Sequence, residues 1–149
     1  MDLFNYQPRR SHEVHIGNKP LGGQQPLRLQ SMTTTLTTDT EASVAQCIAI
    51  IEAGADYVRL TTQGVREAEN LRPIREALHR RGYDTPLVAD VHFNPKVADV
   101  AAGIVEKVRI NPGNYVDPAR TFKELEYTDE EYAAELARLE ERFVQFLDI

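Results

Sequence analysis

The sequence predicts an α/β fold in which parallel strands alternate with helices behind a leading β-hairpin. Four short runs rich in Val, Ile and Leu alternate with stretches whose apolar residues recur every three to four positions. Each run ends in polar or charged residues and is followed by a turn or a helix start. Because connections of this length join parallel strands, we expect all four carboxyl ends on one rim of one sheet.

The strands are expected near residues 27–31, 57–61, 86–91 and 106–110, and the hairpin near 12–22. Val14 and Ile16 stand two positions apart and are followed by a Gly-Asn-Lys-Pro turn, which predicts the hairpin. We expect this hairpin to close the floor of the sheet. Four strand-helix units make half of a TIM (β/α)8-type barrel. A flavodoxin-like sheet is the alternative, because strand order cannot be read from a sequence.

Capping signals delimit the helices between the strands. Thr38 followed by Glu41 predicts a capping box at the start of the first helix. Cys47 lies on the apolar face of that helix and is expected in the core. Pro73 is expected to break or kink the second helix. Asn94, followed by proline, predicts the start of the third.

Two further helices are expected in the last part of the chain. A short one should begin at Asp117, and a longer one should begin at Thr128, which forms a capping box with Glu131. The apolar face of this last helix consists of Tyr132, Leu136, Leu139, Phe143 and Phe146.

Composition narrows the class of protein. The chain has 149 residues, 42% of them hydrophobic, and no low-complexity tract, which favours one packed domain. Its net charge of −6 argues against a general nucleic-acid surface. No apolar run is long enough to span a membrane and the N-terminus lacks a signal pattern, so a cytoplasmic location is expected. The single cysteine excludes an internal disulfide and cannot by itself hold a metal cluster.

The polar residues at the strand ends are the candidate ligand-binding residues. In chain order they are Gln30 and Ser31, then Arg59, then Asp90 and His92, then Arg109 with Asn111 and Asn114. Ser31 also opens a hydroxyl-rich loop. Two arginines, hydroxyls and an Asn-Gly turn on one rim suit a phosphate or diphosphate, because a guanidinium group is a planar fork of donors.

Asp90 and His92 are the catalytic candidates. They stand two residues apart, so an extended backbone puts both side chains on the same face. Asp90 lies in an otherwise apolar run, and a carboxylate inside a sheet must be paired or functional. Two roles remain open for it: it accepts hydrogen bonds from loop amides, or it orients His92 or a catalytic partner.

Four segments together resemble the successive signature segments of the 4-hydroxy-3-methylbut-2-enyl diphosphate synthase family, the iron–sulfur enzymes of the methylerythritol phosphate route to isoprenoids. They are Pro-Leu-Arg-Leu-Gln-Ser-Met-Thr at 26–33, Asp-Tyr-Val-Arg-Leu at 56–60, Val-Ala-Asp-Val-His-Phe at 88–93 and Val-Arg-Ile-Asn-Pro-Gly-Asn at 108–114. Order and spacing match over about residues 9–116, whereas one segment alone would be a weak signal. From Asp117 onward the chain is similar to the longer form of the family found in some bacteria and plastids.

The resemblance implies that residues 1–149 are the N-terminal part of a TIM-barrel substrate-binding domain, without the C-terminal cluster-binding domain. It implies 2-C-methyl-D-erythritol 2,4-cyclodiphosphate as the substrate, opened by two-electron reduction and loss of water at a [4Fe-4S] cluster. Electrons would come from ferredoxin or flavodoxin, and the full-length protein would be a homodimer. Because the cluster cysteines lie outside this chain, we expect it to be inactive alone.

The resemblance also implies roles for the rim residues. Arg59 and Arg109 match family arginines that contact the diphosphate. The residues that match the lining of the same pocket are Gln30, Ser31, Asp90, His92, Asn111 and Asn114. Two other interpretations stay open on the residues alone: a stand-alone phosphate-ligand binding module, and half of a pterin-binding-type barrel such as that of dihydropteroate synthase.

Overall fold

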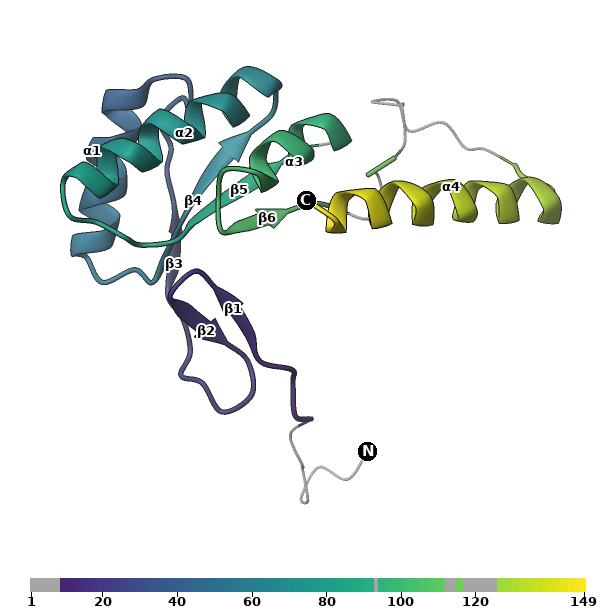
Figure 1. Ribbon diagram of the computed structural model, residues 1–149, viewed down its shortest axis with the longest axis horizontal. Helices are drawn as coiled ribbons and strands as arrows, with labels where there is room; N and C mark the ends of the chain where they lie inside the picture. Colours follow the sequence, from purple (N-terminus) through teal and green to yellow (C-terminus); the bar gives the residue numbers. More distant parts are fainter. Residues whose placement is uncertain (1–8, 93, 112–114, 117–125) are drawn as a thin grey trace.

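A four-stranded parallel sheet forms the centre of the molecule, a computed structural model that describes residues 9–92, 94–111, 115–116 and 126–149 (Figure 1). Its strands are β3 (Gln30–Met32), β4 (Tyr57–Thr62), β5 (Leu87–Val91) and β6 (Lys107–Arg109). They pair in chain order, β3-β4-β5-β6. The predicted parallel sheet is confirmed, and its sequential order is that of a barrel segment and not of a flavodoxin-like sheet.

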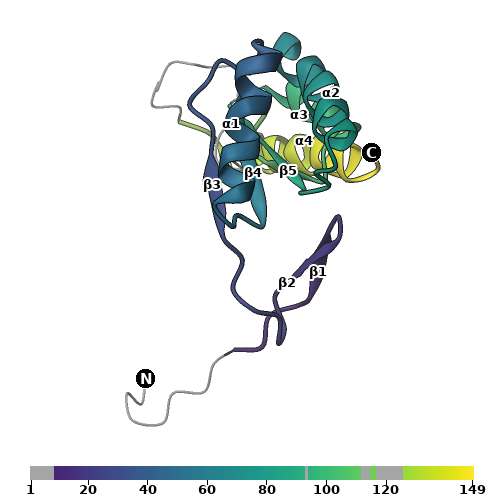
Figure 2. The ribbon, with the colours of Figure 1, turned by 90° about the vertical axis from the view of Figure 1, so that its left-hand side faces the viewer.

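Three helices cover one face of this sheet (Figures 1 and 2). They are α1 (Thr40–Glu52), α2 (Val65–Arg80) and α3 (Pro95–Ala102), and each packs against its neighbour in chain order. Every strand-to-helix connection therefore leaves the sheet at the carboxyl ends of the strands, as the sequence predicts.

Alternation along the strands separates two faces with different chemistry. Val58 and Leu60 of β4 and Leu87, Ala89 and Val91 of β5 are buried against the helices. The helix residues buried in the same core include Val44, Cys47, Leu71, Ile74 and Ala98. The intervening strand residues point to the helix-free face, which corresponds to the lumen of a barrel.

The hairpin closes the amino end of that helix-free face. It consists of β1 (Val14–Ile16) and β2 (Lys19–Leu21), which pair antiparallel. Ile16 is buried against Tyr57 and Val88, near the amino ends of β4 and β5. The Tyr57 hydroxyl donates a hydrogen bond to the Lys19 carbonyl at 3.1 Å. The predicted hairpin and its position at the floor of the sheet are confirmed.

The first strand differs from its predicted range. β3 begins at Gln30, three residues later than expected, and it extends to Met32, which was expected in the following loop. The start of β3 is set by its partner strand, because Gln30 pairs with Tyr57, the first residue of β4. Among the described residues β3 has no other neighbouring strand with which earlier residues could pair. Leu27 and Leu29 are 96% and 63% exposed, so burial of their side chains does not favour an earlier start of the strand.

The predicted capping box of the first helix is wrong. Asp39, and not Thr38, is the N-cap of α1, and its carboxylate accepts a hydrogen bond from the Ala42 amide at 3.1 Å. A carboxylate also suits the positive end of the helix dipole.

Of the two effects predicted for Pro73, the break is wrong, because α2 continues through this residue, and the kink stays a prediction. Leu71 and Ile74 flank the proline and are fully buried in the core. Their packing against the sheet outweighs the backbone hydrogen bond that proline cannot donate.

The later capping signals are confirmed. The Asn94 side chain accepts from the Lys96 amide at 3.0 Å at the start of α3. α4 (Asp129–Leu147) begins with the predicted capping box of Thr128 and Glu131. The short helix expected from Asp117 falls on residues outside the described ranges.

Only part of the apolar face of α4 is covered. Phe143 and Phe146 contact the Tyr115 ring, with centroids 6.3 and 5.9 Å away, whereas Tyr132 and Leu136 are exposed. In the described ranges, α4 and the other helices are each too short or too polar to cross a lipid bilayer.

Replacing Asp39 by alanine removes the N-cap acceptor of α1, so we expect the free energy of unfolding to fall by about 1 kcal/mol. Thr38→Ala is the matched control, because Thr38 is exposed and is not the cap; it should cost less than about 0.5 kcal/mol. Urea unfolding of the full-length protein measures both changes. An equal or larger loss in Thr38→Ala would contradict the capping assignment.

A polypeptide of these 149 residues should self-associate, with two halves completing a barrel-like assembly. In the described part of the chain, β3 and β6 each pair on one side only, and open strand edges pair readily with another chain. Leu27 and Leu29 add exposed apolar surface beside β3. Sedimentation velocity at increasing concentration tests this, and a Leu27→Lys/Leu29→Lys double variant should shift towards monomer. A wild-type polypeptide that stays monomeric at high concentration would count against it.

Candidate functional site

The register of the sheet brings three charged residues together on the helix-free face. Asp90 of β5 is the direct pairing partner of Arg109 on β6. On its other side it pairs with Thr61 of β4, two positions beyond Arg59, so Arg59 points to the same face. These residues lie towards the carboxyl ends of the strands, where the sequence predicts a ligand site.

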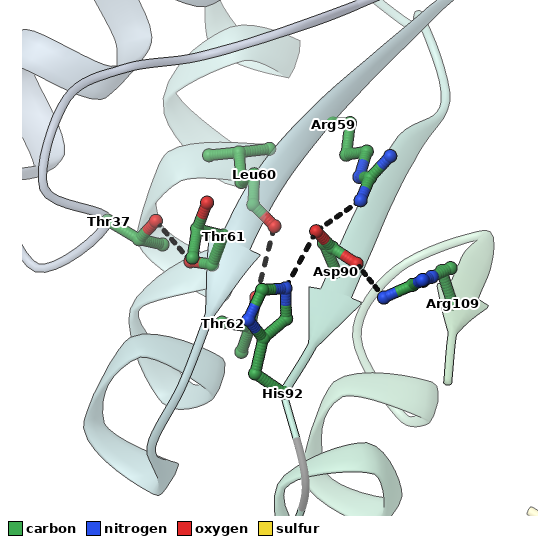
Figure 3. A network of polar contacts seen from close by, with 8 residues as sticks. All are labelled: Thr37, Arg59, Leu60, Thr61, Thr62, Asp90, His92 and Arg109. Atoms are coloured by element: carbon green, nitrogen blue, oxygen red, sulfur yellow. Dashed lines mark hydrogen bonds and ion pairs between the residues drawn. The ribbon is translucent and has the colours of Figure 1, made fainter. Parts of the chain in front are cut away.

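A single carboxylate connects the charged side chains (Figure 3). Asp90 Oδ2 accepts a short hydrogen bond from Arg59 Nη2 and lies 3.0 Å from His92 Nε2. Asp90 Oδ1 accepts from Arg109 Nη1 at 3.2 Å. Of the two roles open for Asp90, the structure therefore shows side-chain pairing, with His92 among the partners.

The environment of Asp90 keeps its carboxylate ionised. Its side chain is 1% exposed, and this burial by itself would raise its pKa. Hydrogen bonds from Arg59 and His92 and the charge of Arg59 outweigh the burial, so the pKa lies below its usual value. At neutral pH two guanidinium charges face one carboxylate, and a net positive charge remains for an anion.

Both arginines keep donors for a ligand. The side chains of Arg59 and Arg109 are 28% and 45% exposed, so each reaches solvent beyond its contact with Asp90. Arg59 Nε is buried and has no hydrogen-bond partner within the described ranges. A guanidinium group carries five N–H donors, and the contact with Asp90 uses only part of this capacity.

The other predicted site residues differ in the face of the sheet that they share and in their position relative to the cluster of Arg59, Asp90, His92 and Arg109. Gln30 pairs with Tyr57 and so shares the face of Arg59, but it lies two positions nearer the amino end of the sheet. Ser31 points to the opposite face, where it borders an open hollow of about 390 Å³ beside α1. Asn111 is exposed two residues after the end of β6, and Asn114 lies outside the described residues.

Two polar helix residues that the sequence did not single out hold the loop after β3. Gln46 Oε1 of α1 accepts from the amides of Thr34 and Thr35 at 2.9 and 3.1 Å. The Asn70 amide group of α2 donates to the Thr37 carbonyl at 2.7 Å. Their only sequence signal is a polar residue beside an apolar helix face, which is the usual pattern of solvated positions.

The Thr37 hydroxyl links the same loop to the sheet. It donates a hydrogen bond to the Thr61 carbonyl at 2.6 Å (Figure 3). The hydroxyl-rich loop is thus held by two helices and β4, on the rim that carries the arginines.

The residues of this chain do not fit an iron–sulfur cluster. Cys47, its only cysteine, is fully buried on the helix side of the sheet, as predicted, and burial raises its pKa to about 12. Cluster ligation requires several thiolates. Among the described residues, no group of three or more His, Cys, Asp or Glu side chains could hold a metal ion.

Fold and charged cluster define the class of this protein: a segment of an α/β barrel with a cationic site at the carboxyl ends of its strands. The chain belongs to the GcpE TIM-barrel domain family, whose model matches residues 11–139. The family resemblance found in the sequence is thereby confirmed.

Several bacterial proteins named 4-hydroxy-3-methylbut-2-en-1-yl diphosphate synthase (flavodoxin) are similar to the chain. The protein of Phocaeicola vulgatus is 69% identical over 149 residues, which are all of this chain and 24% of that protein. That of Bacteroides fragilis is also 69% identical over the same length, and that of Protochlamydia amoebophila is 46% identical over 146 residues, 98% of this chain and 22% of the relative. The chain spans about a quarter of the length of the curated relatives it matches.

Cys47 should resist thiol reagents in the folded protein. Because its pKa is raised to about 12, the reactive thiolate is scarce at pH 8, and burial also blocks access. We expect labelling of the Cys47 peptide by iodoacetamide, followed by mass spectrometry of the full-length protein, only in denaturant. Rapid labelling under native conditions would contradict the core assignment.

Proposed function

We propose that this chain is the diphosphate-binding part of a 4-hydroxy-3-methylbut-2-enyl diphosphate synthase and that its ligand is 2-C-methyl-D-erythritol 2,4-cyclodiphosphate. The observation that carries the proposal is the convergence of Arg59 and Arg109 on Asp90. The names of the relatives support it, because their similarity to this chain extends over its whole length.

The chemistry of the cluster suits this ligand. A diphosphate presents several anionic oxygens, and guanidinium groups bind such oxygens through paired N–H donors. Arg59 and Arg109 contact the same carboxylate, so they lie close enough for one diphosphate to meet both. Each charge-assisted hydrogen bond contributes about 1.5–3 kcal/mol.

Of the two catalytic candidates, His92 is better placed to meet the substrate. Its side chain is 34% exposed, whereas that of Asp90 is 1% exposed and already bound to both arginines. We assign His92 to proton transfer or hydrogen bonding at the bound substrate. The remaining proposed pocket residues are Gln30, Asn111 and Asn114. Ser31 was also expected to line the pocket, but it points to the opposite face of the sheet and is left out of the proposal.

The complete reaction needs parts that this chain lacks. In the full-length enzyme, residues outside this chain would hold a [4Fe-4S] cluster, and the cluster would supply the two electrons for opening the cyclic diphosphate with loss of water. Flavodoxin, the donor in the relatives' names, is the proposed electron source, and the full-length enzyme is proposed to be a homodimer. The family match favours this function over a stand-alone phosphate-binding module or half of a pterin-binding-type barrel.

Arg109→Ala in the full-length enzyme should weaken binding of the cyclic diphosphate at least about tenfold, since loss of one charge-assisted contact exceeds the 1.4 kcal/mol that corresponds to a decade. Arg109→Lys should recover only part of the affinity, because an ammonium group keeps the charge but loses the fork. Isothermal titration calorimetry measures both dissociation constants.

Arg80→Ala is the matched control. Arg80 ends α2 at the opposite end of the sheet, where its side chain is 70% exposed and pairs only weakly with Glu76 at 4.0 Å. Its removal should leave the dissociation constant unchanged. If Arg109→Ala, correctly folded, binds as tightly as this control, the proposed function is wrong.

A further inference from the structure

We propose that Asp90 is a positioning residue, which holds Arg59, Arg109 and His92 in the arrangement that receives the diphosphate. The inference rests on the proposed function. It assigns the affinity of the site partly to a residue that does not itself touch the ligand.

The pattern of exposure separates Asp90 from its partners. The side chain of Asp90 is 1% exposed, whereas those of Arg59, His92 and Arg109 are 28%, 34% and 45% exposed. A ligand that approaches from solvent therefore meets the three partners and not the carboxylate. Asp90 acts on the ligand only through them.

The place of Asp90 in the sheet lets it control both arginines. It stands on β5, between the strand that carries Arg59 and the strand that carries Arg109. Each guanidinium group binds a different oxygen of the carboxylate (Figure 3). Both side chains are thus anchored at one N–H group, and the remaining donors keep a fixed direction.

Such anchoring favours ligand binding through entropy. A free arginine side chain loses rotamer entropy when it is immobilised. Here folding already restricts the two side chains, so the ligand does not have to order them again. A carboxylate that contacts one terminal N–H group of each arginine is therefore compatible with tight binding of an anion.

The charge of Asp90 has the opposite effect. A negative charge beside the bound diphosphate repels it, and this repulsion is stronger in a partly buried site than in water. Removing the charge alone would tighten binding. Weaker binding after removal of the charge therefore indicates a positioning carboxylate, whereas tighter binding indicates a mere counter-ion.

Asp56 provides a matched control within the same fold. Its carboxylate also pairs with two cations, Arg28 and Lys19, and accepts a hydrogen bond from the Leu29 amide at 2.9 Å. It lies just before β4, at the amino end of the sheet and away from the proposed ligand. A purely structural carboxylate should behave like Asp56.

The test compares Asp90→Asn, Asp90→Glu and Asp56→Asn in the full-length protein, by calorimetric titration with the cyclic diphosphate. We expect Asp90→Asn to weaken binding about tenfold or more, although the site becomes more positive. Asp90→Glu keeps the charge but moves the carboxylate by one methylene, and it should weaken binding by a smaller factor. Asp56→Asn should bind like the wild type.

A second comparison tests whether Asp90 acts on the ligand through the two arginines. In an Arg59→Ala/Arg109→Ala background, Asp90→Asn should change the affinity by less than about threefold, because both arginines that it positions are gone and only His92 remains. Thermal unfolding measured in parallel separates stability from binding. A structural role would lower the unfolding midpoints of Asp90→Asn and Asp56→Asn and leave both affinities unchanged.

Unchanged or tighter binding by folded Asp90→Asn would overturn the inference. If that variant does not fold, Asp90→Glu decides, and wild-type affinity there would overturn it equally. The proposed function fails separately, when the arginine variants themselves bind like the wild type. Weak binding by the arginine variants together with normal binding by both Asp90 variants would remove this inference alone.

Discussion

The site depends on the cost of burying a charge. Asp90 is ionised and almost fully buried on a central strand, and such a carboxylate is stable only when hydrogen-bond donors surround it. Arg59, Arg109 and His92 supply those donors. The need for donors around Asp90 therefore also gathers three partly exposed side chains, which can donate hydrogen bonds, at one point of the rim. Folding of the sheet thus assembles this cluster.

The sheet keeps this charged cluster apart from the core. Along β4, Val58 and Leu60 pack against the helices, while Tyr57 and Arg59 point to the other face. On that face the surface changes from apolar to charged within two residues. Tyr57 packs against the hairpin at the floor, and Arg59 reaches Asp90 at the rim. The alternation of side chains along a strand thus places the apolar core on one face of the sheet and the charged cluster on the other.

The loop that follows β3 extends the same organisation. Gln46 and Asn70 bind its backbone, and the Thr37 hydroxyl binds the Thr61 carbonyl on β4. Loops at the carboxyl ends of barrel strands carry most of the contacts to substrates in such enzymes. Here two helices and a strand restrict one of these loops beside the arginine cluster, so a ligand would meet a rim that is ordered beforehand.

The sequence by itself determined the alternation of strands and helices, the hairpin, most caps, and the placement of Arg59, Asp90, His92 and Arg109 near strand ends, because periodicity and capping are local properties. It misplaced β3 and the N-cap of α1 and allowed for a helix break at Pro73 that does not occur. In these places a neighbouring strand, an adjacent carboxylate and core packing decided the outcome. Only the tertiary structure decided that one carboxylate binds both arginines, that Ser31 faces the helices, and that Gln46 and Asn70 hold a loop. Those contacts join residues of different elements, and the register that sets them arises from pairing between strands that lie far apart in the chain.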